Sequence, residues 1–201
     1  MNEKHYLVPE HNEGFEKDIA HDVVAKTIED AEDWFVDAKE RMLDINNWEK
    51  YAPSITVEFR LSDGHGKGMK RSARRGDHIR IDIPGNNNVA TGGFDWATIE
   101  AMEYDDYPDE GMETFAIRIR PSEHPQHKEG DTPQLFPGND ASGTVVIARR
   151  GNKLQAAYHG RNELAGSYAG CKDGSDDDEH TSGWLGITDK QWAELMKGML
   201  R

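Results

Sequence analysis

The chain has 201 residues, with 24 Lys and Arg against 38 Asp and Glu, so its formal net charge is −14. Such a surface repels phosphate backbones, and we therefore expect neither nucleic acid nor an anionic membrane as a partner. The single cysteine, Cys171, excludes an intrachain disulfide and a zinc site made of several cysteines. No run approaches the roughly 20 apolar residues of a membrane span, and the N-terminus lacks the apolar run of a signal peptide. These features predict a cytoplasmic protein without membrane insertion.

The first part of the chain predicts an arm, a strand and a helix. Residues 1–18 carry many charges and no period, which indicates a loose N-terminal arm. A short apolar stretch within residues 19–28 is typical of a first strand. From Glu29 the apolar residues recur at helical spacing, with acidic residues in the first turn, where the helix dipole favours them. We expect this helix to break near residues 44–47 and a short helical turn to follow before Pro53.

Six segments with a period of two come next, as expected for half-buried strands. They are 55–61, 79–83, 94–104, 115–119, 144–149 and 154–161. The stretches 121–143 and 165–183 have no period and predict long loops, which are usually functional or disordered. Thr188 and Gln191 have the spacing of a capping box and open a last amphipathic helix.

This order of elements predicts an α+β fold, in which a curved antiparallel sheet of about seven strands wraps around a long C-terminal helix. One or two short helices follow the first strand. The stretch 31–53, AEDWFVDAKERMLDINNWEKYAP, contains Asp44 ahead of a Trp-x-x-Tyr turn made by Trp48 and Tyr51. Together with the order of strands and the closing helix, this stretch resembles the helix-grip superfamily of START-like, SRPBCC and polyketide cyclase-like proteins. The two long loops depart from that pattern.

The resemblance implies one helix-grip domain over residues 19–201. It also implies a cavity between the sheet and the last helix that takes an apolar or amphipathic ligand. Members of the superfamily share no universal catalytic residue, so the resemblance transfers none to this chain. We expect no cofactor.

The longest predicted strand contains the main candidate for chemistry, Glu100. By the alternation of a strand, one of its faces carries Phe94, Trp96, Thr98, Glu100, Met102 and Tyr104. With that face turned inward, Glu100 would lie among aromatic rings, and desolvation would raise its pKa. In the alternative register Ala97, Ile99 and Ala101 point inward and Glu100 is solvated.

Six residues are therefore candidates for lining the cavity: Trp96, Glu100, Tyr158 and Asn162 from the sheet, and Trp192 and Met196 from the last helix. Three functions remain open. The chain binds a small apolar or amphipathic molecule in the cavity; or it is an enzyme on the same scaffold, with Glu100 as acid or base and Tyr158 orienting the substrate; or it is an interaction protein with a filled core.

Other clusters of reactive side chains lack the spacing that their chemistry needs. His124 and His127 flank a proline and have no evident third metal ligand. The acidic run at 173–180 lacks the alternate-position pattern of a calcium loop. Ser167 and Cys171 lie in a small-residue loop without the strand–turn–helix context of a nucleophile elbow. We predict no metal site and no nucleophilic catalysis here.

Overall fold

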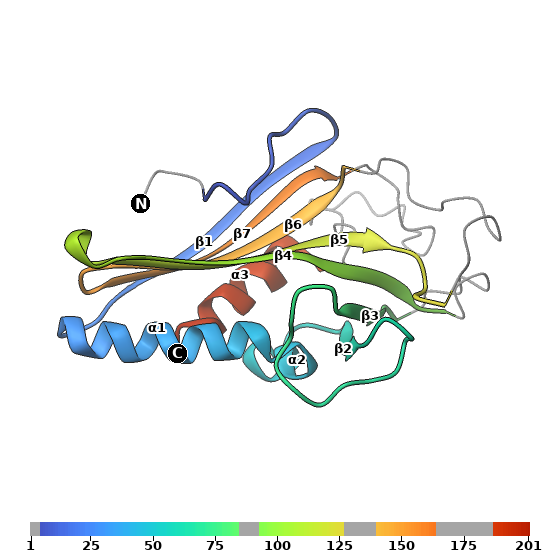
Figure 1. Ribbon diagram of the computed structural model, residues 1–201, viewed down its shortest axis with the longest axis horizontal. Coiled ribbons are helices and arrows are strands. Elements are labelled where there is room, and N and C mark those ends of the chain that lie inside the picture. Colours follow the sequence, from blue (N-terminus) through green and yellow to red (C-terminus); the bar gives the residue numbers. More distant parts are fainter. Residues whose placement is uncertain (1–4, 85–92, 127–139, 164–186) are drawn as a thin grey trace.

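The computed structural model describes residues 5–84, 93–126, 140–163 and 187–201. Its centre is one antiparallel sheet of seven strands in the order β1-β7-β6-β5-β4-β3-β2. The strands are β1 (Phe15–Val24), β2 (Glu58–Ser62), β3 (His78–Asp82), β4 (Asp95–Tyr107), β5 (Met112–Ser122), β6 (Ser142–Arg150) and β7 (Lys153–Glu163). Neighbouring strands follow each other in sequence from β2 to β7, and β1 completes the sheet by pairing with β7. The expected α+β fold is confirmed, and the curved sheet with its C-terminal helix is consistent with the helix-grip fold (Figure 1).

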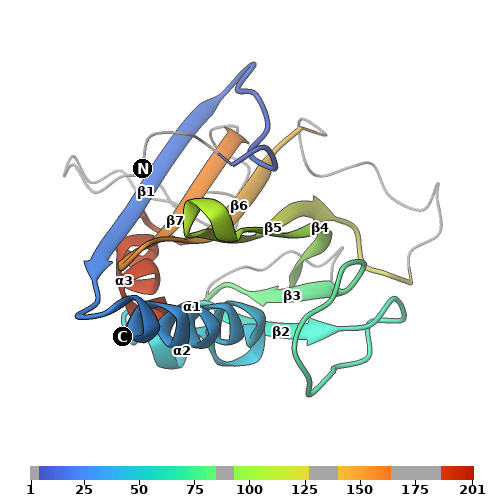
Figure 2. The ribbon, with the colours of Figure 1, turned by 60° about the vertical axis from the view of Figure 1, so that its left-hand side comes forward.

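The helices lie on one side of this sheet (Figures 1 and 2). They are α1 (Ile28–Leu43), α2 (Trp48–Tyr51) and α3 (Asp189–Met199), with the short 3-10 turn η1 (Ile45–Asn47) between α1 and α2. A second 3-10 turn, η3 (Pro108–Glu110), joins β4 to β5. The predicted capping box at the start of α3 is present, since Thr188 and Gln191 bond to each other's backbone. With 16 residues against 11, α1 is longer than α3, so the sheet curves around two helices rather than one long helix.

The main apolar core lies between the concave face of the sheet and these helices. Alternate side chains of each strand enter it because successive residues of a strand point to opposite faces. Its large buried members include Phe35, Met42, Trp48, Phe59, Leu61, Ile79, Ile81, Ile99, Ile117, Ile147, Tyr158, Trp192 and Met196. A smaller cluster on the convex face joins Leu7 to Ala116, Val146 and Ala148. The sheet is therefore covered on both sides around β5 and β6.

The N-terminal segment is more ordered than the sequence predicts. β1 begins at Phe15 rather than near residue 19, and the described residues before it pack on the convex face. Leu7 is buried, and its carbonyl oxygen accepts a hydrogen bond of 3.0 Å from Nη1 of Arg118. These contacts join residues far apart in the chain, so no local pattern could reveal them. The expected arm over 1–18 is wrong for its described part.

An irregular register in β4 changes which side chains share a face. The pairing with β5 shifts between Ile99 and Ala101. Ile99 lies in the main core, whereas Ala101 packs against the cluster on the convex face and Met102 packs against the main core. The alternation thus changes phase at Glu100. The prediction that Glu100 shares a face with Met102 is wrong because a β-bulge of this kind places an extra residue in one strand.

The two long loops predicted from the sequence fall mostly outside the described part of the chain. The whole loop predicted over 165–183 lies outside the described residues, as do residues 127–139 of the loop predicted over 121–143. β5 extends to Ser122 and β6 begins at Ser142, so the ends of the second predicted loop are strand. Over the described ranges, no helix combines the length and the apolar character needed to cross a membrane.

Candidate functional site

The structure brings three of the six predicted site residues together in the main core. Trp192 and Met196 lie on the inward face of α3, with 1% and 0% of their surface exposed. The ring of Tyr158 stacks on Trp192 with centroids 3.7 Å apart and planes 9° apart. Trp48 meets Trp192 edge-on, with ring centroids 6.4 Å apart. At these residues the space expected to hold a ligand is occupied by side chains that pack against one another.

Asn162 instead joins the end of β7 to the N-terminal segment by hydrogen bonds. Its Oδ1 accepts hydrogen bonds from the backbone amides of Asn12 (2.8 Å) and Glu13 (3.2 Å). Its Nδ2 donates to the carbonyl oxygens of Glu10 and Asp140, at 3.3 Å each. The backbone of Asn162 is left-handed, with a φ of 56°, a conformation that Asn adopts more readily than most residues.

Glu100 lies on the convex face, where two arginines hold it. Its Oε2 accepts hydrogen bonds from Nε of Arg118 (2.6 Å) and Nε of Arg120 (2.7 Å). Partial burial alone would raise the pKa of Glu100, but the hydrogen bonds and charges of the two arginines outweigh it and lower the pKa. The predicted raised pKa is therefore wrong, and Glu100 has the environment of an ion-paired carboxylate.

Glu163 has the environment that the sequence predicted for Glu100. Only 4% of its side chain is exposed, and its Oε1 accepts a hydrogen bond of 2.9 Å from the hydroxyl of Tyr158. Nζ of Lys17 lies 3.9 Å from its other oxygen. Burial raises the pKa of Glu163 in spite of that lysine and that hydrogen bond. Glu163 follows the left-handed Asn162, a backbone turn that no periodicity could have shown.

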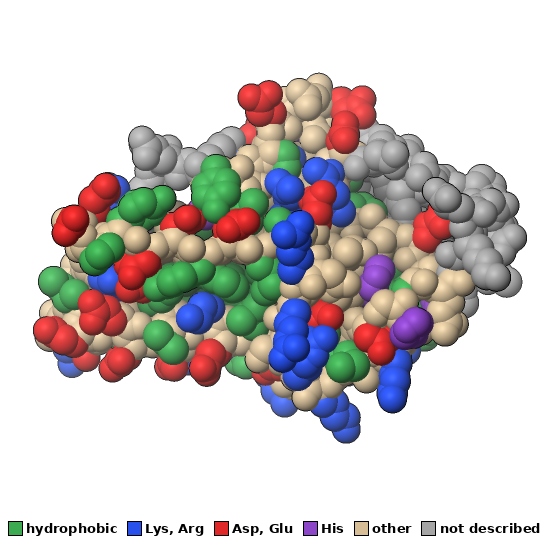
Figure 3. Space-filling view, viewed as in Figure 1, with side chains coloured by type: hydrophobic (Ala, Val, Ile, Leu, Met, Phe, Trp, Pro, Cys, Tyr) green, Lys and Arg blue, Asp and Glu red, His purple; other side chains and the backbone are tan. Residues whose placement is uncertain are grey.

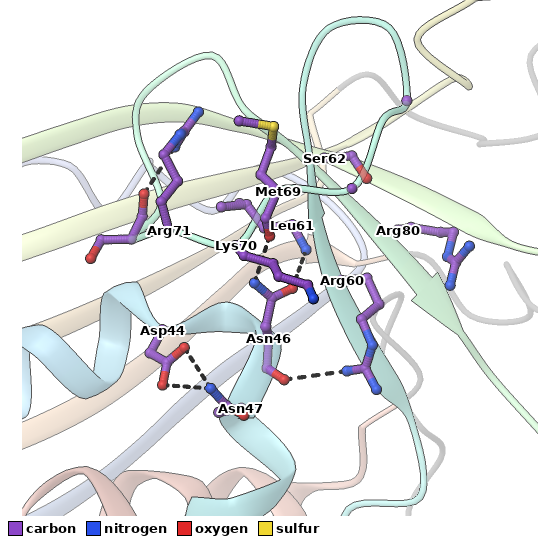
Figure 4. A pocket seen from close by; sticks show the side chains of 13 residues that line it. Asp44, Asn46, Asn47, Arg60, Leu61, Ser62, Met69, Lys70, Arg71 and Arg80 are labelled. Carbon is purple, nitrogen blue, oxygen red and sulfur yellow. Dashed lines mark hydrogen bonds between the residues drawn. The ribbon is translucent and has the colours of Figure 1, made fainter.

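A pocket of about 700 Å³ opens on another part of the molecule, between the turn after α1, strands β2 and β3, and the loop 63–77 that joins them (Figure 4). We call it the basic pocket. Its lining residues are Asp44, Asn46, Asn47, Arg60, Leu61, Ser62, Gly66, Gly68, Met69, Lys70, Arg71, Ser72 and Arg80.

Side-chain hydrogen bonds hold the walls of the basic pocket in place. Asn46 bridges two of them: its Oδ1 accepts from the amide of Leu61 at 2.9 Å, and its Nδ2 donates to the carbonyl of Met69 at 2.9 Å (Figure 4). Asp63 closes the first turn of the loop by accepting from the amides of His65 and Lys67, at 2.9 and 3.0 Å. These two bonds lower the pKa of Asp63. These bonds therefore hold the loop 63–77 at its first turn and at Met69.

Two of the four cations of the basic pocket are neutralised by carboxylates. Arg71 forms a two-point pair with Asp77, with contacts of 2.6 and 2.8 Å. Arg60 lies 3.1 Å from Glu58 and 3.5 Å from Glu49. The carboxylates beside these two arginines largely neutralise their positive charges.

Lys70 and Arg80 are different. Within the part of the chain that the structure describes, neither side chain has a hydrogen-bonding or ionic partner. The guanidinium of Arg80 lies over the ring of Phe94, 4.4 Å from its centroid, and its Nε is buried without an acceptor. Lys70 is exposed at the rim. The basic pocket thus has two cationic groups ready for a ligand.

The charge around this pocket contrasts with the rest of the chain. Residues 60–80 contain seven Lys and Arg and only two acidic residues, Asp63 and Asp77, in a chain whose net charge is −14. Figure 3 shows Lys and Arg side chains gathered over the loop between β2 and β3. The local excess of basic residues is a sequence signal for this site, and a pattern of hydrophobic periods does not reveal it.

A second hollow of about 810 Å³ lies on the convex face beneath the N-terminal segment. Two histidines face it, and each is bonded to a carboxylate: His5 to Asp105 at 3.2 Å, and His159 to Asp18 at 2.5 Å. Because both histidines already pair with carboxylates of the same hollow, it offers an anion less than the basic pocket does.

The remaining sequence candidates add no site. In residues 5–84, 93–126, 140–163 and 187–201, no group of three or more His, Cys, Asp and Glu is arranged to hold a metal ion. His124 is described and packs its ring against Trp96. His127, Ser167, Cys171 and the acidic run at 173–180 lie outside the described residues.

No protein-family model and no curated protein matches the chain. Among solved structures, it is similar to the hypothetical protein jhp0584 from Helicobacter pylori, with 11% identity, a TM-score of 0.48, and 92% of this chain and 86% of that chain covered. It is also similar to truncated norcoclaurine synthase from Thalictrum flavum, with 13% identity, a TM-score of 0.30, and 76% and 81% covered. The order and packing of its own strands and helices define an α+β protein and are consistent with a helix-grip fold.

Proposed function

We propose that the protein binds a small oxyanion, a carboxylate or a phosphate, in the basic pocket. The observation that carries this proposal is a pair of cations, Lys70 and Arg80, that have no hydrogen-bonding or ionic partner among the described residues. They border a hollow of about 700 Å³ in a strongly acidic chain. A buried donor without an acceptor costs stability, and a bound oxyanion would supply one. Charge-assisted hydrogen bonds of this kind are roughly twice as strong as neutral ones.

The two cations suit different tasks. The guanidinium of Arg80 is planar and is held over Phe94, so it presents its donors in a fixed direction. Lys70 has a flexible stem and adapts its ammonium group to the ligand. Asp44, the one carboxylate of the lining, is occupied by Asn47 at 2.9 Å and by the Tyr51 hydroxyl at 3.1 Å, which reduces its repulsion of an anion.

Calorimetric titration with inorganic phosphate and with citrate tests this proposal. Lys70→Ala and Arg80→Gln should each weaken binding by about tenfold or more, because each removes a hydrogen bond to a charged group. Lys153→Ala is the matched control, since it removes the same charge from the exposed β6–β7 hairpin, away from the pocket. Equal weakening by all three variants would show only an effect of net charge and would refute the site.

The buried pair of Tyr158 and Glu163 favours a second candidate function, the first of the three that the sequence left open. A polar pair at the edge of an apolar core is suited to the polar end of an apolar or amphipathic molecule held between the sheet and α3. Such a ligand must displace Trp192 from its stack on Tyr158. Native mass spectrometry of protein purified from cells tests it: a retained molecule whose binding survives Lys70→Ala would support this candidate, and protein without any bound molecule would count against it.

A further inference from the structure

We propose that the ligand of the basic pocket carries a second oxygen acceptor, which is recognised by three donors on neighbouring strands: Arg80 of β3, Trp96 of β4 and Ser122 of β5. We call these residues the donor row. The inference rests on the proposed function, because Arg80 belongs both to the donor row and to the lining of the basic pocket.

The register of the sheet places the donor row side by side. Arg60 is opposite Arg80 in the β2–β3 pair, Arg80 is opposite Trp96 in the β3–β4 pair, and Trp96 is opposite Ser122 in the β4–β5 pair. Residues directly opposite one another have their side chains on the same face and in contact range. The row therefore runs across the convex face from the basic pocket towards β5.

Each member of the donor row has a buried polar atom with no hydrogen-bond partner in the part of the chain that the structure describes. These atoms are Nε of Arg80, the indole Nε1 of Trp96 and Oγ of Ser122. Trp96 as a whole is only 4% exposed. Buried indole N–H groups usually find an acceptor, so three such atoms at adjacent positions of one row mark a place where an acceptor is missing.

The tip of the loop 63–77 connects the donor row with the pocket. Gly66 lines the basic pocket, and a Cβ added to it would lie 3.5 Å from the ring of His124 and 3.7 Å from the indole of Trp96. Gly66 has a φ of 73°, which favours glycine. His124 meets Trp96 edge-on with ring centroids 4.7 Å apart. A ligand that extends from Lys70 past Arg80 would thus come under the loop tip and reach the six-membered ring of Trp96, whose N–H belongs to the donor row.

The chemistry of the row selects the ligand class. Arginine and indole N–H groups only donate, and the serine hydroxyl can donate as well, so the row takes an oxygen acceptor. An apolar tail would leave all three donors unpaired, which a site built for hydrogen bonding rejects. The ligand is thus an anion with a second oxygen function at a distance from the first, such as a dicarboxylate or a phosphorylated polyol, rather than a fatty acid.

Matched pairs of probes test this inference on the intact protein. Calorimetry would compare the dicarboxylates from malonate to adipate with monocarboxylates of the same chain length. It would also compare glycerol phosphate with propyl phosphate, so that the two arms distinguish a carboxylate head from a phosphate head. For at least one pair, the probe with the second oxygen should bind about tenfold or more tightly than its partner. Trp96→Phe keeps a ring but removes the N–H, and it should abolish this advantage while leaving the simpler probe unaffected.

Two further variants make the result decisive. Ser122→Ala should reduce the same advantage with little change in packing, even if Trp96→Phe disturbs the fold. Trp34→Phe is the control, because Trp34 lies on α1 and is 42% exposed. If both members of every pair bind equally, and neither Trp96→Phe nor Ser122→Ala has an effect, the donor row holds only water and the inference is overturned, while the basic pocket stands. If no probe binds, or Lys70→Ala changes nothing, the proposed function itself fails.

Discussion

Removal of the indole of Trp192 should destabilise the protein more than removal of any exposed aromatic side chain. Trp192 is 1% exposed at the centre of the core, stacked on Tyr158 at 3.7 Å and touched edge-on by Trp48 at 6.4 Å. Trp192→Ala therefore removes a large apolar surface from the core and breaks two aromatic contacts at once. The groups around it are held by the sheet and by α2, so the cavity should collapse only in part.

The size of the effect follows from these contacts. Replacing a buried Trp by Ala costs about 3–5 kcal/mol of unfolding free energy, including the cavity that remains. The stacking and edge contacts with Tyr158 and Trp48 place Trp192 at the upper end of that range, since aromatic pairs add about 0.5–1.5 kcal/mol beyond area burial. A domain of this size has about 5–15 kcal/mol of stability in total. The variant should thus fold marginally, with Tm lowered by about 10–20 °C.

Urea unfolding followed by far-ultraviolet circular dichroism measures this loss, because the signal does not depend on the tryptophan that is removed. The slope of unfolding free energy against urea should match the wild-type slope, which shows that the compactness of the end states is unchanged. Trp34→Ala is the control, since this indole is 42% exposed on α1 and should cost well under 1 kcal/mol, as surface changes do. A loss below about 0.5 kcal/mol for Trp192→Ala would refute the packing of α3 against the sheet.

Two further predictions concern Glu163 and Gly198. Burial raises the pKa of Glu163 in the folded state, so the folded protein holds this proton more tightly and stability falls as pH rises from the ordinary glutamate pKa through the raised one. Glu163→Gln removes the titrating carboxyl, so the unfolding free energy of the variant relative to wild type should rise with pH in urea titrations. Parallel pH profiles of the two proteins would contradict the raised pKa. Gly198→Ala should destabilise the protein by about 1–3 kcal/mol through overpacking, although Ala favours a helix by about 1 kcal/mol over Gly, because the new Cβ would overlap the carbonyl oxygen of Tyr51. Gly68→Ala has open space around it and should be nearly neutral in the same measurement.

The sequence determined the secondary structure and the class of fold. Helical spacing from Glu29, the period of two in six segments and the capping box at Thr188 gave elements that the structure confirms. They could be predicted because a buried stripe repeats every 3.6 residues on a helix and every two on a strand, whatever its partner is. The inward positions of Trp192 and Met196 were confirmed for the same reason.

The positions of the candidate carboxylates, Glu100 and Glu163, depended on backbone irregularities that have no local sequence pattern. One irregular residue in β4 moved Glu100 to the convex face, where it pairs with Arg118 and Arg120. Glu163, which follows the left-handed backbone of Asn162, is the buried carboxylate in place of Glu100. A period of two predicts faces correctly only while the register is unbroken, so any inference that crosses a bulge fails.

The amino-acid sequence by itself fixed which faces of each helix and strand are apolar, and hence a sheet that curves around helices. It also contained the excess of basic residues between 60 and 80. Only the tertiary structure decided which of those cations keep a partner. Asp77 neutralises Arg71, and Glu58 lies beside Arg60, while Lys70 and Arg80 border the pocket without partners among the described residues. Pairing of charges depends on distances of a few ångströms between segments that meet only in the folded chain, and those distances are set by the packing of the sheet.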